Sequence, residues 1–172
     1  MQIISDADIQ QRTTQVAQCL LQRQWMLATA ESCTGGWLAK CCTDISGSST
    51  WFDRGVITYS NDAKQDLLDV PVVTLNEFGA VSKQTVIEMA QGALRHSKAD
   101  ISVAITGIAG PDGGSLDKPV GTVWLAWATK DAATMSQCHH FEGDRDMIRR
   151  QAVLIALEGI IKNARDSYLS MG

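Results

Sequence analysis

The chain has 172 residues, a formal net charge of −4, 45% apolar residues and 20% charged residues. This length suits one globular domain, so we expect a single domain over residues 1–172 without a linker or an internal repeat. No cluster of lysine and arginine stands out, which makes nucleic acid a poor candidate partner, because neutralisation of phosphates dominates that affinity. No apolar run approaches membrane-span length, and the N-terminus lacks the apolar region of a signal peptide, so no membrane partner is expected.

The five cysteines include no C-x-x-C pair, and their number is odd. This pattern predicts reduced thiols in a cytoplasmic protein and argues against a disulfide framework or a zinc site. His139 and His140 are adjacent, so on a strand their side chains point to opposite faces. We therefore expect no metal and no cofactor.

The first part of the chain alternates helical and extended patterns. Ser5 can cap a helix with Asp8 at its third position, and apolar residues at helical spacing continue to Leu20. In chain order the next expected elements are a strand over residues 25–28, a polar turn over 29–36, a helix over 37–42, a loop over 44–50, a strand over 54–59 and a helix over 63–68.

The second part adds a hairpin. We expect a connection over residues 72–81, a helix capped by Ser82, a strand over 101–105, a glycine-rich loop over 107–115, paired strands over 120–128 and 134–141, and a last helix opened by residues 143–146. Strands that alternate with helices indicate a partly parallel sheet covered on both faces. The predicted fold class is thus α/β, a three-layer α/β/α domain with a mixed sheet and a C-terminal β-hairpin plus helix.

The stretch from Thr29 to Gly36 links a short apolar strand to a helix through a carboxylate, hydroxyls, a thiol and two glycines. Free N–H groups at a helix start attract anions, and glycines let a ligand approach the backbone. The plain alternative is a tight turn in which Ser32 or Thr34 caps the helix. This stretch alone does not decide between the two interpretations.

Polar groups end three of the expected strands, at Glu31-Ser32, at Tyr59-Ser60 and at Thr106-Gly107. If these strands are parallel, their carboxyl ends share one edge of the sheet, where ligands bind in open α/β folds. Lys64 lies in the early turns of the helix that follows Tyr59. A helix N-terminus and partial burial both favour a neutral lysine, which can deprotonate a serine hydroxyl with help from a tyrosine. The plain alternative is a solvated surface lysine.

Other candidates are weaker by themselves. Ser48 and Ser49 follow a glycine, which usually means a turn and a cap. Arg145 and Arg149 lie one helical turn apart, either on a solvated face or where they can pair with a phosphate or carboxylate. The chain contains no G-x-x-x-x-G-K-[ST], G-x-G-x-x-G or G-x-S-x-G motif, which disfavours a P-loop nucleotidase, a Rossmann dehydrogenase and a standard α/β-hydrolase.

Taken together, several stretches resemble the CinA C-terminal domain family across nearly the whole chain. The matching residues are 29–36, Gly47-Ser48-Ser49 with Trp51-Phe52, 56–61 with Lys64, 105–114, 118–123, 141–145 and 149–151. By this resemblance, the stand-alone bacterial members hydrolyse the carboxamide of nicotinamide mononucleotide. The products, nicotinic acid mononucleotide and ammonia, feed NAD salvage, and the family is thought to need no metal.

The resemblance and the residues together give a hypothesis for the site. A serine activated by Lys64, with Tyr59 assisting, forms an acyl-enzyme, and we favour Ser48 as nucleophile, then Ser49, then Ser32. Backbone N–H groups near Gly47 or Gly107 stabilise the oxyanion, Thr106 positions the carboxamide, and Arg145 is the first choice for the phosphate. The full set of expected substrate-binding residues is Glu31, Ser32, Thr34, Gly35, Gly47, Ser49, Gly107 and Arg145.

Two alternatives of other kinds remain open. One is a non-catalytic nucleotide-binding module in competence or DNA-damage responses, and the other is a different amidase or a hydrolase of another pyridine nucleotide. We also expect a homodimer or higher homo-oligomer, since Trp37, Trp51, Trp124 and Trp127 do not obviously fit one core.

Overall fold

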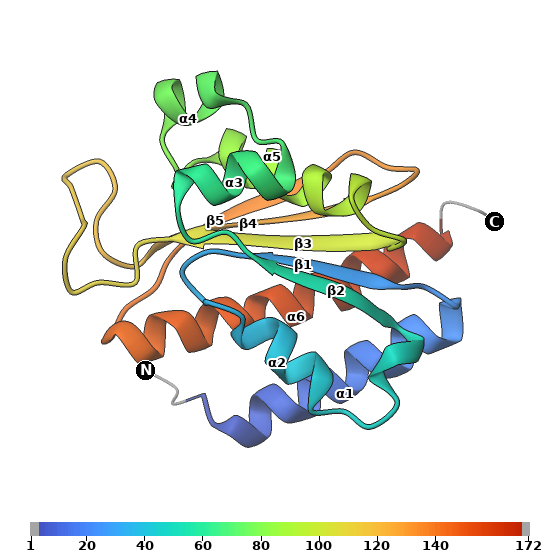
Figure 1. Cartoon of the computed structure of the whole chain (residues 1–172). Helices are drawn as coiled ribbons and strands as arrows, with labels where there is room; N and C mark the ends of the chain where they lie inside the picture. Colours follow the sequence, from blue (N-terminus) through green and yellow to red (C-terminus); the bar gives the residue numbers. More distant parts are fainter. Residues whose placement is uncertain (1–3, 170–172) are drawn as a thin grey trace.

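The computed structural model describes residues 4–169, with the side chains of residues 4–166. Five strands form one sheet in the order β2-β1-β3-β4-β5 (Figure 1). Their bounds are β1 Leu27–Glu31, β2 Phe52–Ile57, β3 Ile101–Gly107, β4 Thr122–Thr129 and β5 Met135–His140. The pairs β1–β2 and β1–β3 are parallel, whereas β3–β4 and β4–β5 are antiparallel. The predicted mixed α/β sheet with a C-terminal hairpin is therefore confirmed.

Helices cover both faces of the sheet (Figure 1). On one face lie α1 (Asp6–Arg23), α2 (Trp37–Thr43) and α6 (Arg145–Leu169), and on the other lie α3 (Asn61–Leu68), α4 (Val72–Phe78) and α5 (Lys83–Arg95). Each face buries its own apolar cluster, built around Leu27 and Val103 on the α6 side and around Ala30 and Ala104 on the α5 side. Alternation along β1 and β3 sends successive side chains to opposite faces, which explains the two clusters.

Several predicted boundaries shift. The first strand runs to Glu31 rather than ending at Ala28, because its residues pair with strands on both sides. The stretch 72–81, predicted as a connection, contains the full helix α4. The polar turn after β1 is thus shorter than expected, and its functional groups come directly from the end of β1, the middle one of the three parallel strands.

The tryptophans fit this one fold. Trp51 and Trp127 are buried, Trp37 packs against the α6-side cluster and Trp124 against the α5-side cluster. Trp127 Nε1 donates to the carbonyl oxygen of Ala156 at 3.1 Å, across from Gly159. Tryptophan content therefore gives no argument for self-association.

No helix in the described part of the chain has the length and apolar character needed to cross a membrane. Within residues 4–169, no group of three or more histidine, cysteine, aspartate and glutamate side chains is arranged to hold a metal ion.

Candidate active site

A serine and a lysine meet at the carboxyl end of β1. Lys64 Nζ lies 3.3 Å from Ser32 Oγ and donates to the carbonyl oxygen of Thr58 at 2.8 Å. Lys64 is 1% exposed and Ser32 is 8% exposed. Two residues separated by 32 positions thus form a buried pair with the atoms needed for proton transfer.

Local structure fixes both members of the pair. The N–H of Ser32 donates to Ile105 O at 3.0 Å, which continues the β1–β3 ladder one residue beyond the strand. Ser60 caps α3 by accepting from the N–H of Ala63 at 3.0 Å. Lys64 therefore lies in the first turns of α3 and points back to the sheet edge.

The environment of Lys64 favours its neutral form. Burial lowers the pKa of Lys64 below its ordinary value of 10.5, since a dry site penalises the ammonium, and only the neighbouring Cys33 acts in the opposite direction. Among the described residues, Lys64 has no carboxylate partner within ion-pair distance. A neutral amine next to a serine hydroxyl can act as a general base.

Glu31 faces the other side of the sheet. Its carboxylate is 1% exposed and accepts from the N–H groups of Leu38 at 2.9 Å and Ala39 at 3.0 Å. Neither Ser32 nor Thr34 caps α2, because Glu31 satisfies the free N–H groups of its first turn. The helix start that we interpreted as a possible anion site is thus already filled by a carboxylate.

Arg149 contacts the turn from α6. Its Nε donates to Cys33 O at 3.0 Å and its Nη2 donates to Thr34 O at 3.1 Å. Gly35 sits beside this guanidinium with a φ of +60°, where a Cβ would lie 3.8 Å from Nη2. The sequence offered Arg149 only as a weaker candidate, on one helical face with Arg145 and able to pair with a phosphate or carboxylate, whereas its partners here are backbone carbonyl oxygens.

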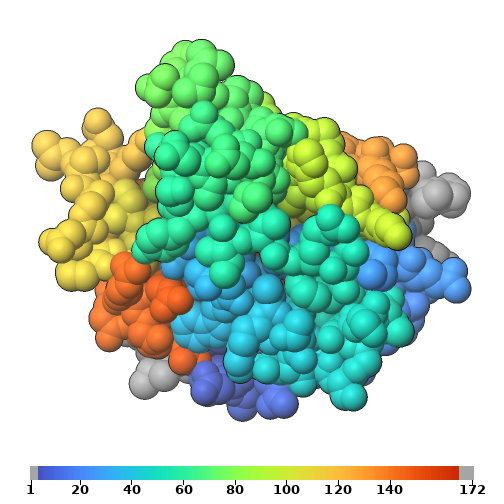
Figure 2. Space-filling view, in the orientation of Figure 1, coloured from blue at the N-terminus to red at the C-terminus, as the bar shows by residue number. Residues whose placement is uncertain are grey.

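Arg145 joins two segments at the rim of the site. Its Nη1 donates to Gly110 O at 2.8 Å, and its Nη2 donates to the hydroxyl of Tyr59 at 3.2 Å. Tyr59 is 62% exposed, so its hydroxyl lies at the rim and not within the buried pair. Figure 2 shows the glycine-rich loop (yellow) beside the start of α6 (orange), where this contact is made.

Thr106 and Gly107 end β3 beside β1. The hydroxyl of Thr106 is buried and donates to Ala80 O at 2.9 Å, which brings the segment before α5 to the same edge of the sheet. A Cβ on Gly107 would lie 2.7 Å from Val123 Cγ2, so this glycine allows close approach of β4. Nothing in the sequence pattern pointed to Ala80.

Gly47, Ser48 and Ser49 lie elsewhere. Ser48 begins a short 3₁₀ helix (Ser48–Thr50) that leads into β2, whereas Lys64 follows the far end of β2. Because β2 is parallel to β1 and six residues long, its two ends are separated by roughly 15–20 Å. The expectation that Ser48 and Lys64 share one site is therefore wrong within a single chain; the serine that meets Lys64 is Ser32.

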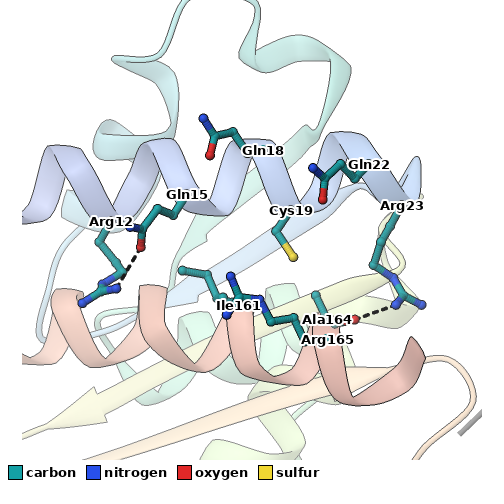
Figure 3. A pocket seen from close by; sticks show the side chains of 9 residues that line it. All are labelled: Arg12, Gln15, Gln18, Cys19, Gln22, Arg23, Ile161, Ala164 and Arg165. Carbon is teal, nitrogen blue, oxygen red and sulfur yellow. Dashed lines mark hydrogen bonds between the residues drawn. The ribbon is translucent and has the colours of Figure 1, made fainter. Parts of the chain in front are cut away.

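A groove on the helix face of the molecule is far from this pair (Figure 3). It has a volume of about 780 Å³ and lies between α1 and the C-terminal half of α6. Two of its arginines are already engaged, Arg12 with Glu158 at 3.0 Å and Arg23 with Ala164 O at 2.6 Å. The groove thus contributes nothing to the chemistry at Ser32.

An α/β fold with a buried serine–lysine pair at the carboxyl end of a parallel strand suits a small hydrolytic enzyme. Residues 9–164 match the model of the CinA C-terminal domain, and the chain belongs to that family.

Named relatives agree with this assignment. The chain is 53% identical over 155 residues to nicotinamide-nucleotide amidohydrolase PncC of Escherichia coli K12, covering 90% of this chain and 94% of that protein. It is 46% identical over 149 residues to the PncC of Pseudomonas putida, covering 87% and 92% of the two chains. The crystal structure of a competence/damage-inducible protein, CihA, from Agrobacterium tumefaciens superposes with a TM-score of 0.89 at 44% identity, covering 94% of this chain and 98% of that one.

Proposed function

We propose that this protein hydrolyses the carboxamide of nicotinamide mononucleotide to nicotinic acid mononucleotide and ammonia. The observation that carries the proposal is the buried contact between Ser32 Oγ and Lys64 Nζ. The names of relatives that share about half of their residues with this chain supply the substrate. We place the reaction in pyridine-nucleotide salvage in the cytoplasm.

In the first half of the reaction, neutral Lys64 takes the proton of the Ser32 hydroxyl as Oγ attacks the carboxamide carbon. The tetrahedral intermediate then breaks its C–N bond. Lys64 returns the proton to the departing nitrogen, which leaves as ammonia. The nicotinoyl group stays on Ser32 as an ester.

In the second half, Lys64 takes a proton from water, and the resulting hydroxide attacks the ester carbon. The bond to Ser32 Oγ breaks, and Lys64 returns the proton to that oxygen. No other acid or base is required, so the cycle starts again with a neutral lysine.

We propose that the phosphate of the nucleotide binds at the rim through Arg145 and Tyr59. Arg145 is exposed and joins the glycine-rich loop to the end of β2, so both segments border the entrance to Ser32. A guanidinium offers the planar donors that a phosphate accepts. Because its hydroxyl contacts Arg145 and not Lys64, Tyr59 acts in this proposal on the phosphate and not as a proton relay.

The test is ammonia release from nicotinamide mononucleotide by the purified protein after treatment with EDTA. We expect ammonia and nicotinic acid mononucleotide in equal amounts, with loss of turnover in Ser32→Ala and Lys64→Met. Ser48→Ala is the matched control and should keep the wild-type rate. A folded protein that binds the nucleotide without releasing ammonia would support the non-catalytic binding module instead.

The oligomeric state is a separate part of the proposal. We propose a homo-oligomer, which is consistent with exposed apolar side chains on α4 and in the connection between β3 and β4, among them Val72, Val73 and Leu116. Light scattering coupled to size-exclusion chromatography tests this; a mass near 18.6 kDa at micromolar concentration would show a monomer.

A further inference from the structure

Three features outside the serine–lysine pair concern the turn that carries Ser32. Arg149 binds two successive carbonyl oxygens of that turn, Cys33 O and Thr34 O. No acceptor for the N–H of Thr34 is found among residues 4–169. Arg149 approaches from α6, whereas Lys64 approaches from α3 on the opposite face of the sheet (Figure 1).

The geometry of a trans peptide connects these features. In the peptide unit between Cys33 and Thr34, the C=O and the N–H point in opposite directions because the unit is planar. Arg149 fixes the C=O of this unit toward α6. The N–H of Thr34 is therefore directed away from α6, toward the side on which Ser32 Oγ meets Lys64 Nζ.

We propose that Arg149 is a positioning residue that holds the N–H of Thr34 as an oxyanion donor for the reaction at Ser32. Backbone N–H groups close after a nucleophile are well suited to this task, since they need no reorganisation when charge develops on the substrate oxygen. The sequence led us to expect these donors near Gly47 or Gly107. The 3₁₀ helix after Gly47 lies at the wrong end of β2, and Gly107 is paired with Val123 in the sheet.

The guanidinium holds the turn in a way that a single positive charge does not reproduce. It spans two carbonyl oxygens with two separate donors, Nε and Nη2. An ammonium on a lysine stem reaches one acceptor at a time with comparable geometry. Arg149→Lys should thus keep the charge and lose much of the orientation.

Arg150 provides a matched control. Its guanidinium lies 5.0 Å from the ring centre of Trp37, and that of Arg149 lies 5.3 Å from the same ring. Arg150 pairs with Asp6 and Asp146 and does not contact the turn. Arg150→Met thus removes a neighbouring guanidinium and leaves the proposed donor in place.

The experiment compares kcat and KM for nicotinamide mononucleotide in Arg149→Met, Arg149→Lys and Arg150→Met. Loss of one oxyanion donor lowers kcat by roughly 100- to 1,000-fold, so we expect that loss in Arg149→Met with KM within about threefold of wild type. The kcat of Arg149→Lys should fall between those of Arg149→Met and the wild type, and Arg150→Met should keep the wild-type kcat. A kcat loss of equal size in Arg149→Met and Arg150→Met would overturn the inference.

Chemical rescue separates positioning from simple destabilisation. Arg149→Ala leaves space for a small guanidinium beside Cys33 O and Thr34 O, so added methylguanidinium should restore part of kcat, whereas methylammonium should restore less. Absence of rescue in folded Arg149→Ala that still binds the nucleotide would contradict the proposal, because the missing donors would then not be what limits turnover.

This inference rests on the proposed function, and the two can fail separately. If Ser32→Ala still releases ammonia, the serine–lysine mechanism is wrong whatever Arg149 does. If Ser32→Ala is inactive but Arg149→Met keeps the wild-type kcat, only the role of Arg149 is wrong.

Discussion

Lys64 Nζ lies 2.8 Å from the carbonyl oxygen of Thr58, and this contact holds the amine at the end of β2 without a neutralising carboxylate. A carbonyl oxygen orients the lysine but gives it no ion pair. Burial therefore decides the protonation of Lys64, and the pKa of this group is lowered. Both the rate of the reaction and the stability of the fold should therefore depend on pH through the protonation of Lys64.

The rate of deamidation should rise with pH. Neutral Lys64 is the reactive form, so kcat/KM should increase about tenfold per pH unit below the lowered pKa and level off above it. This increase is measured as the pH profile of ammonia release, and the control variant Ser48→Ala should show the same profile as the wild type. A profile that is flat from mildly acidic to alkaline pH would exclude Lys64 as the base.

Lys64→Met should stabilise the fold while abolishing turnover. The folded protein loses the lysine proton at a lower pH than the unfolded chain, whose pKa is near 10.5, so the unfolded chain holds more protons between these values. Wild-type stability thus rises with pH through that window, and the cost of the buried amine is largest below it. We expect Lys64→Met to gain roughly 0.5–2 kcal/mol at neutral pH, with a smaller gain as pH increases.

Urea unfolding of both proteins at several pH values tests this expectation. An advantage of Lys64→Met that stayed constant with pH would point to packing, and a disadvantage at neutral pH would mean that the bond to Thr58 outweighs the burial of the amine.

Glu31→Gln should weaken the fold more than it changes substrate affinity. The amide keeps one acceptor for α2 but places a donor against the second N–H group, a change worth about 1–3 kcal/mol for a buried charged acceptor. Urea unfolding and KM should be measured together. Asp8→Asn serves as the comparison, because the Asp8 carboxylate accepts from the N–H of Ser5, the N-cap of α1, at an exposed position. Unchanged stability with a raised KM would show that Glu31 binds substrate, as the sequence alone suggested.

Arg145→Met should impair recognition of the phosphate. Nicotinamide riboside lacks the phosphate and is an internal reference, so the preference for the mononucleotide over the riboside should fall by roughly tenfold or more, the scale of a charge-assisted hydrogen bond. Tyr59→Phe removes the hydroxyl that accepts from Arg145 and should cause a smaller loss in the same direction. An unchanged preference in Arg145→Met would move the phosphate site elsewhere.

Gly159→Ala should destabilise the protein even though alanine is the better helix former. A Cβ at this position would lie 2.1 Å from Trp127 Cε2, so α6 or the buried ring would have to shift. Overpacking of this kind costs about 1–3 kcal/mol, which exceeds the roughly 1 kcal/mol gained in helix propensity. Lys162→Ala, at an exposed position of the same helix, controls for helix propensity in thermal unfolding. Equal melting temperatures of Gly159→Ala and the wild type would show that the sheet around Trp127 shifts to accommodate the methyl group.

The fold class was accessible from the sequence because strand and helix patterns alternate clearly, and the parallel order of β1, β2 and β3 brings Ser32, Tyr59 and Thr106 to one edge. The choice among serines depended on strand pairing. The strand expected over residues 54–59 already separates Ser48 from Lys64, and the parallel pairing of β1 with β2 brings Ser32 to the end of β2 that Lys64 follows.

The roles of Glu31 and Arg149 were also hidden, for a common physical reason. Each binds backbone atoms, and backbone partners leave no trace in side-chain patterns. A carboxylate beside two glycines looks the same in sequence whether it meets a ligand or a helix start. Their contacts depend on where α2 and α6 cross the end of β1.

The carboxylate of Glu31 at the start of α2 also bears on inhibition by small anions. The start of α2, which follows the turn after Ser32, is a natural docking point for sulfate or inorganic phosphate, and here Glu31 satisfies its first-turn N–H groups. The proposed oxyanion donor, the N–H of Thr34, is one group and not a helix start, so free anions of the cell or of the buffer should compete only weakly for the carboxamide. With the substrate phosphate bound at Arg145, as proposed, the enzyme should keep working in a phosphate-rich solution.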